Sequence, residues 1–116
     1  MSECFVILVI NCIVDERERA GFDKHIVPRL AELADRRAEI VQLERLQDLT
    51  PHVDCTHVLI SGSELSAARH HPTDDVLLGF IRRTVDGGLP LLGICYGHQM
   101  IARALLDDGA CRRAAV

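Results

Sequence analysis

The chain of 116 residues has few aromatic side chains: no Trp, one Tyr and three Phe. Its core must therefore consist of aliphatic residues, which suits parallel strands that are buried on both faces. The chain also lacks a charge bias, because 13 basic and 17 acidic residues are interleaved and give a net charge of -4. A nucleic-acid binder would show a basic stripe, so we expect no nucleic-acid partner.

The cysteines and histidines lack the spacing of a metal site. The cysteine count is odd and no CxxC pair occurs, and none of the six histidines pairs with a cysteine at zinc spacing. We expect free thiols, no metal and no cofactor. Three of the thiols are predicted to be small core residues: Cys4, Cys55 and Cys111.

Long hydrophobic runs are missing as well. The first apolar run, residues 5–10, is too short to span a bilayer and follows Glu3 rather than a basic segment. We therefore expect no membrane association, no signal peptide and a cytoplasmic location.

Apolar and β-branched stretches alternate with stretches of helical spacing. This alternation predicts βαβ units, with a parallel sheet covered by helices on both faces. Loops that follow such strands meet at one edge of the sheet, where functional groups lie. The predicted strands are residues 4–10, 38–43, 56–61 and 89–94, with a further strand starting in 110–116; residues 11–21, 46–54 and 63–72 are connectors.

The helices are predicted from periodicity and from their end signals. The first covers residues 22–34 and starts either at Asp23, with a kink at Pro28, or near Val27. The second begins at a Thr73 cap and ends at residues 87–88, and the third covers 97–106. The second helix is predicted to bury Val76, Leu77, Phe80, Ile81 and Val85.

The stretch from Leu91 to Gln99 carries most of the functional signal. An apolar run stops at Cys95, with Gly93 and Gly97 two residues to either side, and a helix follows. Strand, sharp turn and helix form the architecture of a nucleophile elbow. The helix N-terminus favours the thiolate, and the backbone N–H of Tyr96 can hold an oxyanion. The alternative is an inert buried thiol, which this glycine-flanked turn disfavours.

A second glycine-bearing turn, residues 60–64, follows the third predicted strand. Its backbone amides, from Gly62 or Ser63, are predicted to supply the second oxyanion donor in the same cleft. The alternative is an ordinary strand-to-loop turn.

The segment Gly-Ile-Cys-Tyr-Gly-His-Gln, residues 93–99, resembles the G-x-C-x-G-x-Q signature of class I (triad-type) glutamine amidotransferases, and GMP-synthase-like domains most of all. Residues 61–63 resemble the family's oxyanion strand, usually Ser-Gly-Gly-Pro, with Ser63-Glu64 in place of Gly-Pro. The resemblance covers residues 4–116. It implies a flavodoxin-like three-layer sandwich with a mainly parallel sheet.

The resemblance also implies roles for individual residues. Cys95 attacks the side-chain amide of glutamine, while Tyr96 N–H and the amide of Gly62 or Ser63 form the oxyanion hole. Gln99 helps to hold the glutamine. Ammonia leaves, water hydrolyses the thioester to glutamate, and the ammonia passes to a synthase domain or subunit.

One part of the family pattern is missing from these 116 residues. The family's base is the histidine of a downstream His-x-Glu motif, but the last histidine here is His98. We interpret residues 1–116 as the amino-terminal portion of a single amidotransferase domain. We expect little or no turnover from it alone, and an uncovered sheet edge that promotes association. Structural or surface positions are expected for His25, His52, His57, His70, His71 and His98.

Two other functions stay open. One is a γ-glutamyl hydrolase or peptidase of the same fold, which Gln99 and the residues Tyr96-Gly97-His98 within the elbow disfavour. The other is a non-catalytic module that binds glutamine or docks on a synthase partner.

Overall fold

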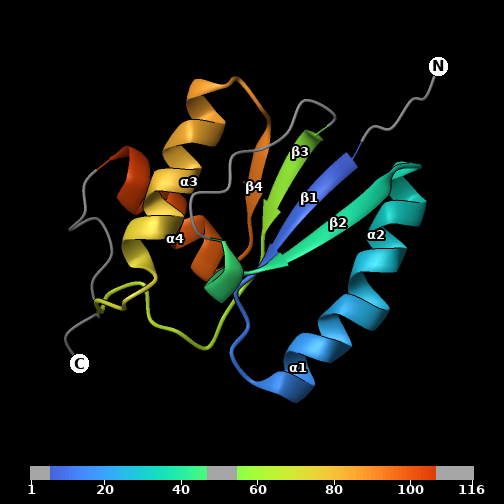
Figure 1. Cartoon of the computed structure of the whole chain (residues 1–116), viewed down its shortest axis with the longest axis horizontal. Helices are drawn as coiled ribbons and strands as arrows, with labels where there is room; N and C mark the ends of the chain where they lie inside the picture. Colours follow the sequence, from blue (N-terminus) through green and yellow to red (C-terminus); the bar gives the residue numbers. More distant parts are fainter. Residues whose placement is uncertain (1–5, 47–54, 107–116) are drawn as a thin grey trace.

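The strands form one parallel sheet in a computed structural model that describes residues 6–46 and 55–106 (Figure 1). The order of the described strands is β2-β1-β3-β4, and every neighbouring pair is parallel. This confirms the predicted α/β class and the parallel sheet. The strands are β1 (Val6–Asn11), β2 (Arg37–Gln42), β3 (Cys55–Ile60) and β4 (Leu91–Gly93).

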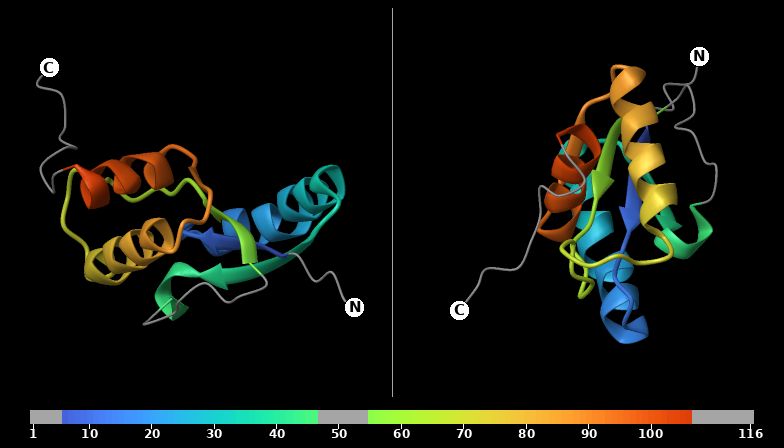
Figure 2. Two further views of the ribbon diagram at one scale, coloured as in Figure 1. Left: turned by 90° about the horizontal axis from the view of Figure 1, so that it is seen from above. Right: turned by 90° about the vertical axis from the view of Figure 1, so that its left-hand side faces the viewer.

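Helices cover both faces of this sheet. Helices α1 and α2 lie on one side, and α3 and α4 lie on the other (Figures 1 and 2). The result is the three-layer sandwich that the sequence predicts. The helices are α1 (Glu16–Gly21), α2 (Val27–Ala34), α3 (Asp74–Asp86) and α4 (Tyr96–Leu105), with a π-helical segment at Phe22–Ile26 and a 3-10 turn at Leu43–Arg45.

Two apolar clusters fill the spaces between the layers. All six residues of β1 are buried, and the side chains of residues 7–10 alternate between the clusters. Leu8 and Ile10 pack with α3 and α4, whereas Ile7 and Val9 pack with Val27 of α2. The low aromatic content is thus matched by an aliphatic core around a central strand.

The first helical region differs from both predicted starts. Helix already begins at Glu16, inside the expected loop, because the side chain of Asp15 accepts a hydrogen bond from Glu18 N at 2.9 Å. Ahead of Pro28 the helix widens into π turns, and Val27 N bonds to Phe22 O. Pro28 lacks an N–H and would clash with the carbonyl four residues earlier, so the widening accommodates it without a break.

The second helical region corrects two further details. Thr73 occupies the cap position but makes no side-chain cap bond. Val85 is exposed, and Thr84 is buried in its place, with its hydroxyl donating to Phe80 O at 2.8 Å. Helical spacing from Leu77 puts position 84 on the buried face, and the backbone bond lets a hydroxyl occupy it.

The remaining differences concern element ends. β4 is shorter than the predicted 89–94, although Pro90 O still accepts from Val58 N at 3.0 Å. Residues 4–5, most of the 46–54 connector and the strand expected to start in 110–116 lie outside the described residues, as do Cys4 and Cys111. Cys55 is buried, as predicted. None of the described helices has the length and apolar character needed to cross a membrane.

Candidate active site

Cys95 sits in a strained backbone conformation between β4 and α4. It is the N-cap residue of α4, with φ 50° and ψ -106°, and its side chain is exposed. Such a conformation in a residue other than glycine costs on the order of 1–3 kcal/mol and persists only where neighbours impose it. Here Ile94 N donates to Ile60 O at 2.9 Å, and Cys95 O accepts from Gln99 N at 3.0 Å.

Two glycines allow this turn to form. A Cβ on Gly97 would lie 2.4 Å from Ile60 O, and a Cβ on Gly93 would lie 2.4 Å from His98 N. Both contacts are with backbone atoms, which cannot rotate away. Glycine at these two positions therefore lets α4 start directly against β3 and keeps Cys95 above the sheet.

The turn after β3 lies beside the cysteine. A Cβ on Gly62 would lie 3.8 Å from Cys95 Cβ and 3.7 Å from Ile94 O. Among residues 6–46 and 55–106, the backbone N–H groups of Gly62, Ser63 and Tyr96 make no recorded hydrogen bond. Gly62 and Tyr96 thus lie next to the exposed Cys95, and the three amides have no acceptor within this part of the protein.

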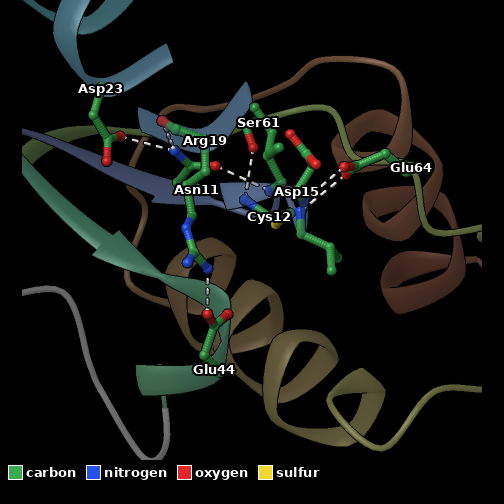
Figure 3. A network of polar contacts seen from close by, with 10 residues as sticks. Asn11, Cys12, Asp15, Arg19, Asp23, Glu44, Ser61 and Glu64 are labelled. Carbon is green, nitrogen blue, oxygen red and sulfur yellow. Dashed lines mark hydrogen bonds and ion pairs between the residues drawn. The ribbon is translucent and has the colours of Figure 1, made fainter. Parts of the chain in front are cut away.

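Polar side chains hold this turn against the loop that follows β1 (Figure 3). The Ser61 hydroxyl accepts from Cys12 N at 2.7 Å and donates to Gly62 O at 2.8 Å. The Glu64 carboxylate accepts from Val14 N at 2.9 Å and from Asp15 N at 2.8 Å. Bonds from these two amides, Val14 first, lower the pKa of Glu64.

Buried Asn11 orders the same loop from the other side. Its amide nitrogen donates to Asp23 Oδ1 at 2.8 Å, and its Oδ1 accepts from Ile13 N at 3.0 Å. Arg19 forms an ion pair with Glu44 beyond it. The sequence reasoning missed the roles of Asn11 and Glu64 in this network. For Asn11 the available signal was a polar residue directly after a predicted strand, at the edge where loops converge, whereas Glu64 carried no such signal.

Titratable side chains are also buried below the elbow, and burial keeps two of them, Tyr96 and Cys12, protonated. Tyr96 projects its side chain into the core, where burial raises the pKa of its hydroxyl. Burial likewise raises the pKa of Cys12 to about 12. Arg103 Nη1 lies 3.1 Å from Asp74 Oδ2, and both side chains are buried. Of the three cysteines in the described part of the chain, Cys95 is the exposed one, whereas burial keeps Cys12 protonated.

Of the five described histidines, His98 alone belongs to the elbow segment, residues 93–99. His98 lines a groove on the outer side of β4 and α4, and His57 is exposed near the start of β3. His71 Nε2 lies 3.2 Å from Ser66 O, and His70 Nδ1 lies 3.6 Å from Asp74 Oδ2. His25 is exposed in the π-helical segment.

His52 lies outside the described residues. Gln99 is exposed in the first turn of α4. No cluster of three or more potential metal ligands occurs among the residues that the structure describes.

Comparisons with known proteins agree with this geometry. The profile of the family described as glutamine amidotransferase class-I matches residues 18–108. Two curated proteins, both named pyridoxal 5'-phosphate synthase subunit PdxT and from Mycobacterium sp. strains KMS and JLS, are each 36% identical over 86 residues. That alignment covers 74% of this chain and 40% of each relative, so the matched part spans about two fifths of their length.

A solved structure supports the same fold. The crystal structure of a glutamine amido transferase from Methylobacillus flagellatus superposes with a TM-score of 0.63 at 20% sequence identity. The match covers 86% of this chain and 38% of that chain. Together with the matched profile, which includes the whole elbow, these findings show that the chain belongs to the class I glutamine amidotransferase family.

Proposed function

We propose that the chain provides the nucleophilic half of a glutaminase site. Cys95 attacks the side-chain carbonyl carbon of glutamine, a C–S bond forms, and the former carbonyl oxygen takes the negative charge. Collapse of this intermediate expels ammonia, which needs a proton from a general acid, and leaves a γ-glutamyl thioester. Water then hydrolyses the thioester to glutamate.

The conformation of Cys95 is the observation that carries this proposal. An exposed thiol with φ 50° at the start of α4, beside the Gly62 turn, is the arrangement of a nucleophile elbow. The open N–H groups of Tyr96 and of Gly62 or Ser63 are suited to an oxyanion that forms next to the sulfur. We assign the contact with bound glutamine to Gln99.

We propose a synthase as the acceptor of the ammonia. The relatives are named as subunits of pyridoxal 5'-phosphate synthase, which favours a separate synthase subunit. The GMP-synthase-like subtype stays a prediction, as does the cytoplasmic location. The 116-residue chain itself is expected to show little or no turnover, because it carries no His-x-Glu motif after Cys95.

Covalent labelling tests the proposal without requiring turnover. A chloromethyl ketone analogue of glutamine should alkylate Cys95 with loss of chloride, and free glutamine should slow the reaction. Peptide mapping by mass spectrometry reads the site, and Cys95→Ala is the control that should remove it. Labelling of Cys95 that glutamine does not slow, at any concentration up to tens of millimolar, would count against a glutamine site.

Two further outcomes separate the alternatives. Stronger protection by γ-glutamyl peptides than by glutamine would support a γ-glutamyl hydrolase instead. Steady release of glutamate from glutamine, abolished by Cys95→Ala, would show that the chain needs no added histidine. Protected labelling without turnover is the expected result; with this chain alone it also fits a glutamine-binding module.

A further inference from the structure

The turn that carries the open amides is fixed at both of its ends to one neighbouring loop. Ser61, at its start, accepts from Cys12 N, and Ser61 N donates to Ile10 O at 3.0 Å. Glu64, at its end, accepts from Val14 N and Asp15 N. Residues 62 and 63 lie between these two anchors.

The two anchors differ in kind. Ser61 is fully buried, and its N–H extends the bonding between β3 and β1 by one residue beyond the end of β3. Glu64 is exposed, and its two bonds connect a side chain to the backbone of a different loop. A carboxylate has two oxygens and can accept both amides at once, as Figure 3 shows. A glutamine has one acceptor oxygen, and its NH₂ group would face an N–H donor.

We infer that Glu64 is a positioning residue for the oxyanion hole. By joining the turn after β3 to the loop after β1, it holds the Gly62 and Ser63 amides beside Cys95 in the orientation that a developing oxyanion needs. Its carboxylate bonds to the backbone amides of Val14 and Asp15 and not to Cys95. The inference rests on the proposed function, because it assigns the support of a site that the proposal defines. Preorganised donors of this kind stabilise charge only when their geometry is fixed before reaction.

The test compares two reagents on the same thiol. The glutamine chloromethyl ketone places a carbonyl oxygen in the hole, whereas iodoacetamide alkylates a thiol without needing it. We expect Glu64→Gln to reduce the maximal rate of chloroketone labelling about tenfold, less than the loss of a donor itself would cause. The concentration for half-maximal rate, the iodoacetamide rate and the midpoint of thermal unfolding should stay near wild type.

Matched variants make the result specific. Glu32→Gln applies the same chemical change to an exposed carboxylate of α2 that pairs with Arg29, and it should leave both labelling rates unchanged. Glu64→Asp keeps the charge but shortens the side chain, so it should retain only part of the chloroketone rate.

The possible failures are distinguishable. If the wild type shows no glutamine-protected labelling, the proposed function fails and the inference fails with it. If the wild type labels as proposed and Glu64→Gln labels at the same rate, only the inference is wrong. Equal losses with both reagents, together with a lower unfolding temperature, would show a general structural role and would also overturn it.

Discussion

The β4–α4 unit has an inner side and an outer side that differ sharply in packing. On the inner side Met100 is fully buried and Arg103 is 6% exposed, so α4 is fixed against β3 and α3. On the outer side Leu92 is 61% exposed and Leu106 is 79% exposed, although both are large apolar residues. The turn that carries Cys95 is therefore anchored from one side only.

Two hollows are lined in part by the exposed strand β4. A groove of about 420 Å³ runs between β4 and α4 and includes Leu92, His98 and Leu105. A second hollow of about 290 Å³ lies on the opposite face of β3 and β4, next to Leu30 of α2. Among the described residues nothing covers either one. We infer that the elbow geometry depends on interior contacts and not on the outer flank. The following predictions test this.

The largest contrast is expected in thiol chemistry. Cys95 is exposed, whereas burial moves the pKa of Cys12 from 9.0 to about 12. At pH 8 this shift lowers the thiolate fraction of Cys12 about a thousandfold relative to an unfolded chain. Iodoacetamide should modify Cys95 in the folded protein and modify Cys12 only after denaturation, as peptide mapping would reveal. Equal rates at the two thiols in the folded protein would contradict the assignment of the inner side.

The same shift predicts a pH dependence of stability. The raised pKa of Cys12 means that the folded state keeps its proton while the unfolded state loses it. The stability that this difference in proton binding contributes to the folded state is complete below pH 9.0 and is lost as the pH rises toward about 12. In urea unfolding, the free energy of unfolding of Cys12→Ala should fall less steeply between these pH values than that of the wild type. Equal pH slopes for the two proteins would refute this prediction.

The next effect is expected at the buried ion pair of α3 and α4. Arg103→Met leaves the Asp74 carboxylate buried without its cation, and such a loss costs about 3–5 kcal/mol in the free energy of unfolding. Arg29→Met removes an exposed pair with Glu32 and should cost less than about 0.5 kcal/mol. Chemical denaturation measures both. Similar costs for the two variants would show that the inner side is not the anchored one.

A smaller loss, about 3 kcal/mol, is expected from Gly97→Ala, because the new Cβ would overlap Ile60 O and push α4 away from β3. Gly21→Ala is the control: no atom lies within 4 Å of its Cβ position, and alanine should stabilise α1 by about 0.5–1 kcal/mol. In Gly97→Ala both the free energy of unfolding and the glutamine-protected labelling of Cys95 should fall. In Gly21→Ala neither should fall. A stable Gly97→Ala protein with wild-type labelling would disprove this account of the elbow.

The smallest effect on stability is expected on the outer side. Leu92→Ser should change the free energy of unfolding by less than about 0.5 kcal/mol, whereas Met100→Ala on the inner side should cost about 2–5 kcal/mol. Leu92→Ser should also reduce self-association, which sedimentation velocity measures, because it removes an exposed apolar side chain at a strand edge. A large loss of stability in Leu92→Ser would show that the outer flank does support the fold.

The sequence predicted the layers and the elbow well, for a physical reason. Buried parallel strands such as Val6–Asn11 are continuously apolar, and the spacing of Gly93, Cys95 and Gly97 meets a steric demand that few other turns have. These features are local, so they can be read from neighbouring residues. The helix start at Glu16 was also encoded locally, in the Asp15 cap, but its polar first turns concealed it.

Features that depend on pairing between distant segments were not predicted. The bonds of Glu64 with Val14 and Asp15 join residues about fifty positions apart, and no local spacing pattern predicts them. The burial of Thr84 in place of Val85 was missed for a local reason, because it depends on a backbone acceptor one helical turn earlier that hydropathy does not register. The sequence thus indicated the glycine-flanked turn at Cys95 but not the contacts that hold its surroundings in place.

The left-handed backbone at Cys95 has a consequence for how this chain can change over generations. Any side chain at position 95 raises the energy of the fold, and Cys95→Gly would relieve that strain while removing the sulfur. Drift toward a more stable protein would therefore remove the thiol on which the proposed chemistry depends. A lineage released from selection on its chemistry would be expected to lose this cysteine early, well before the buried aliphatic residues of β1.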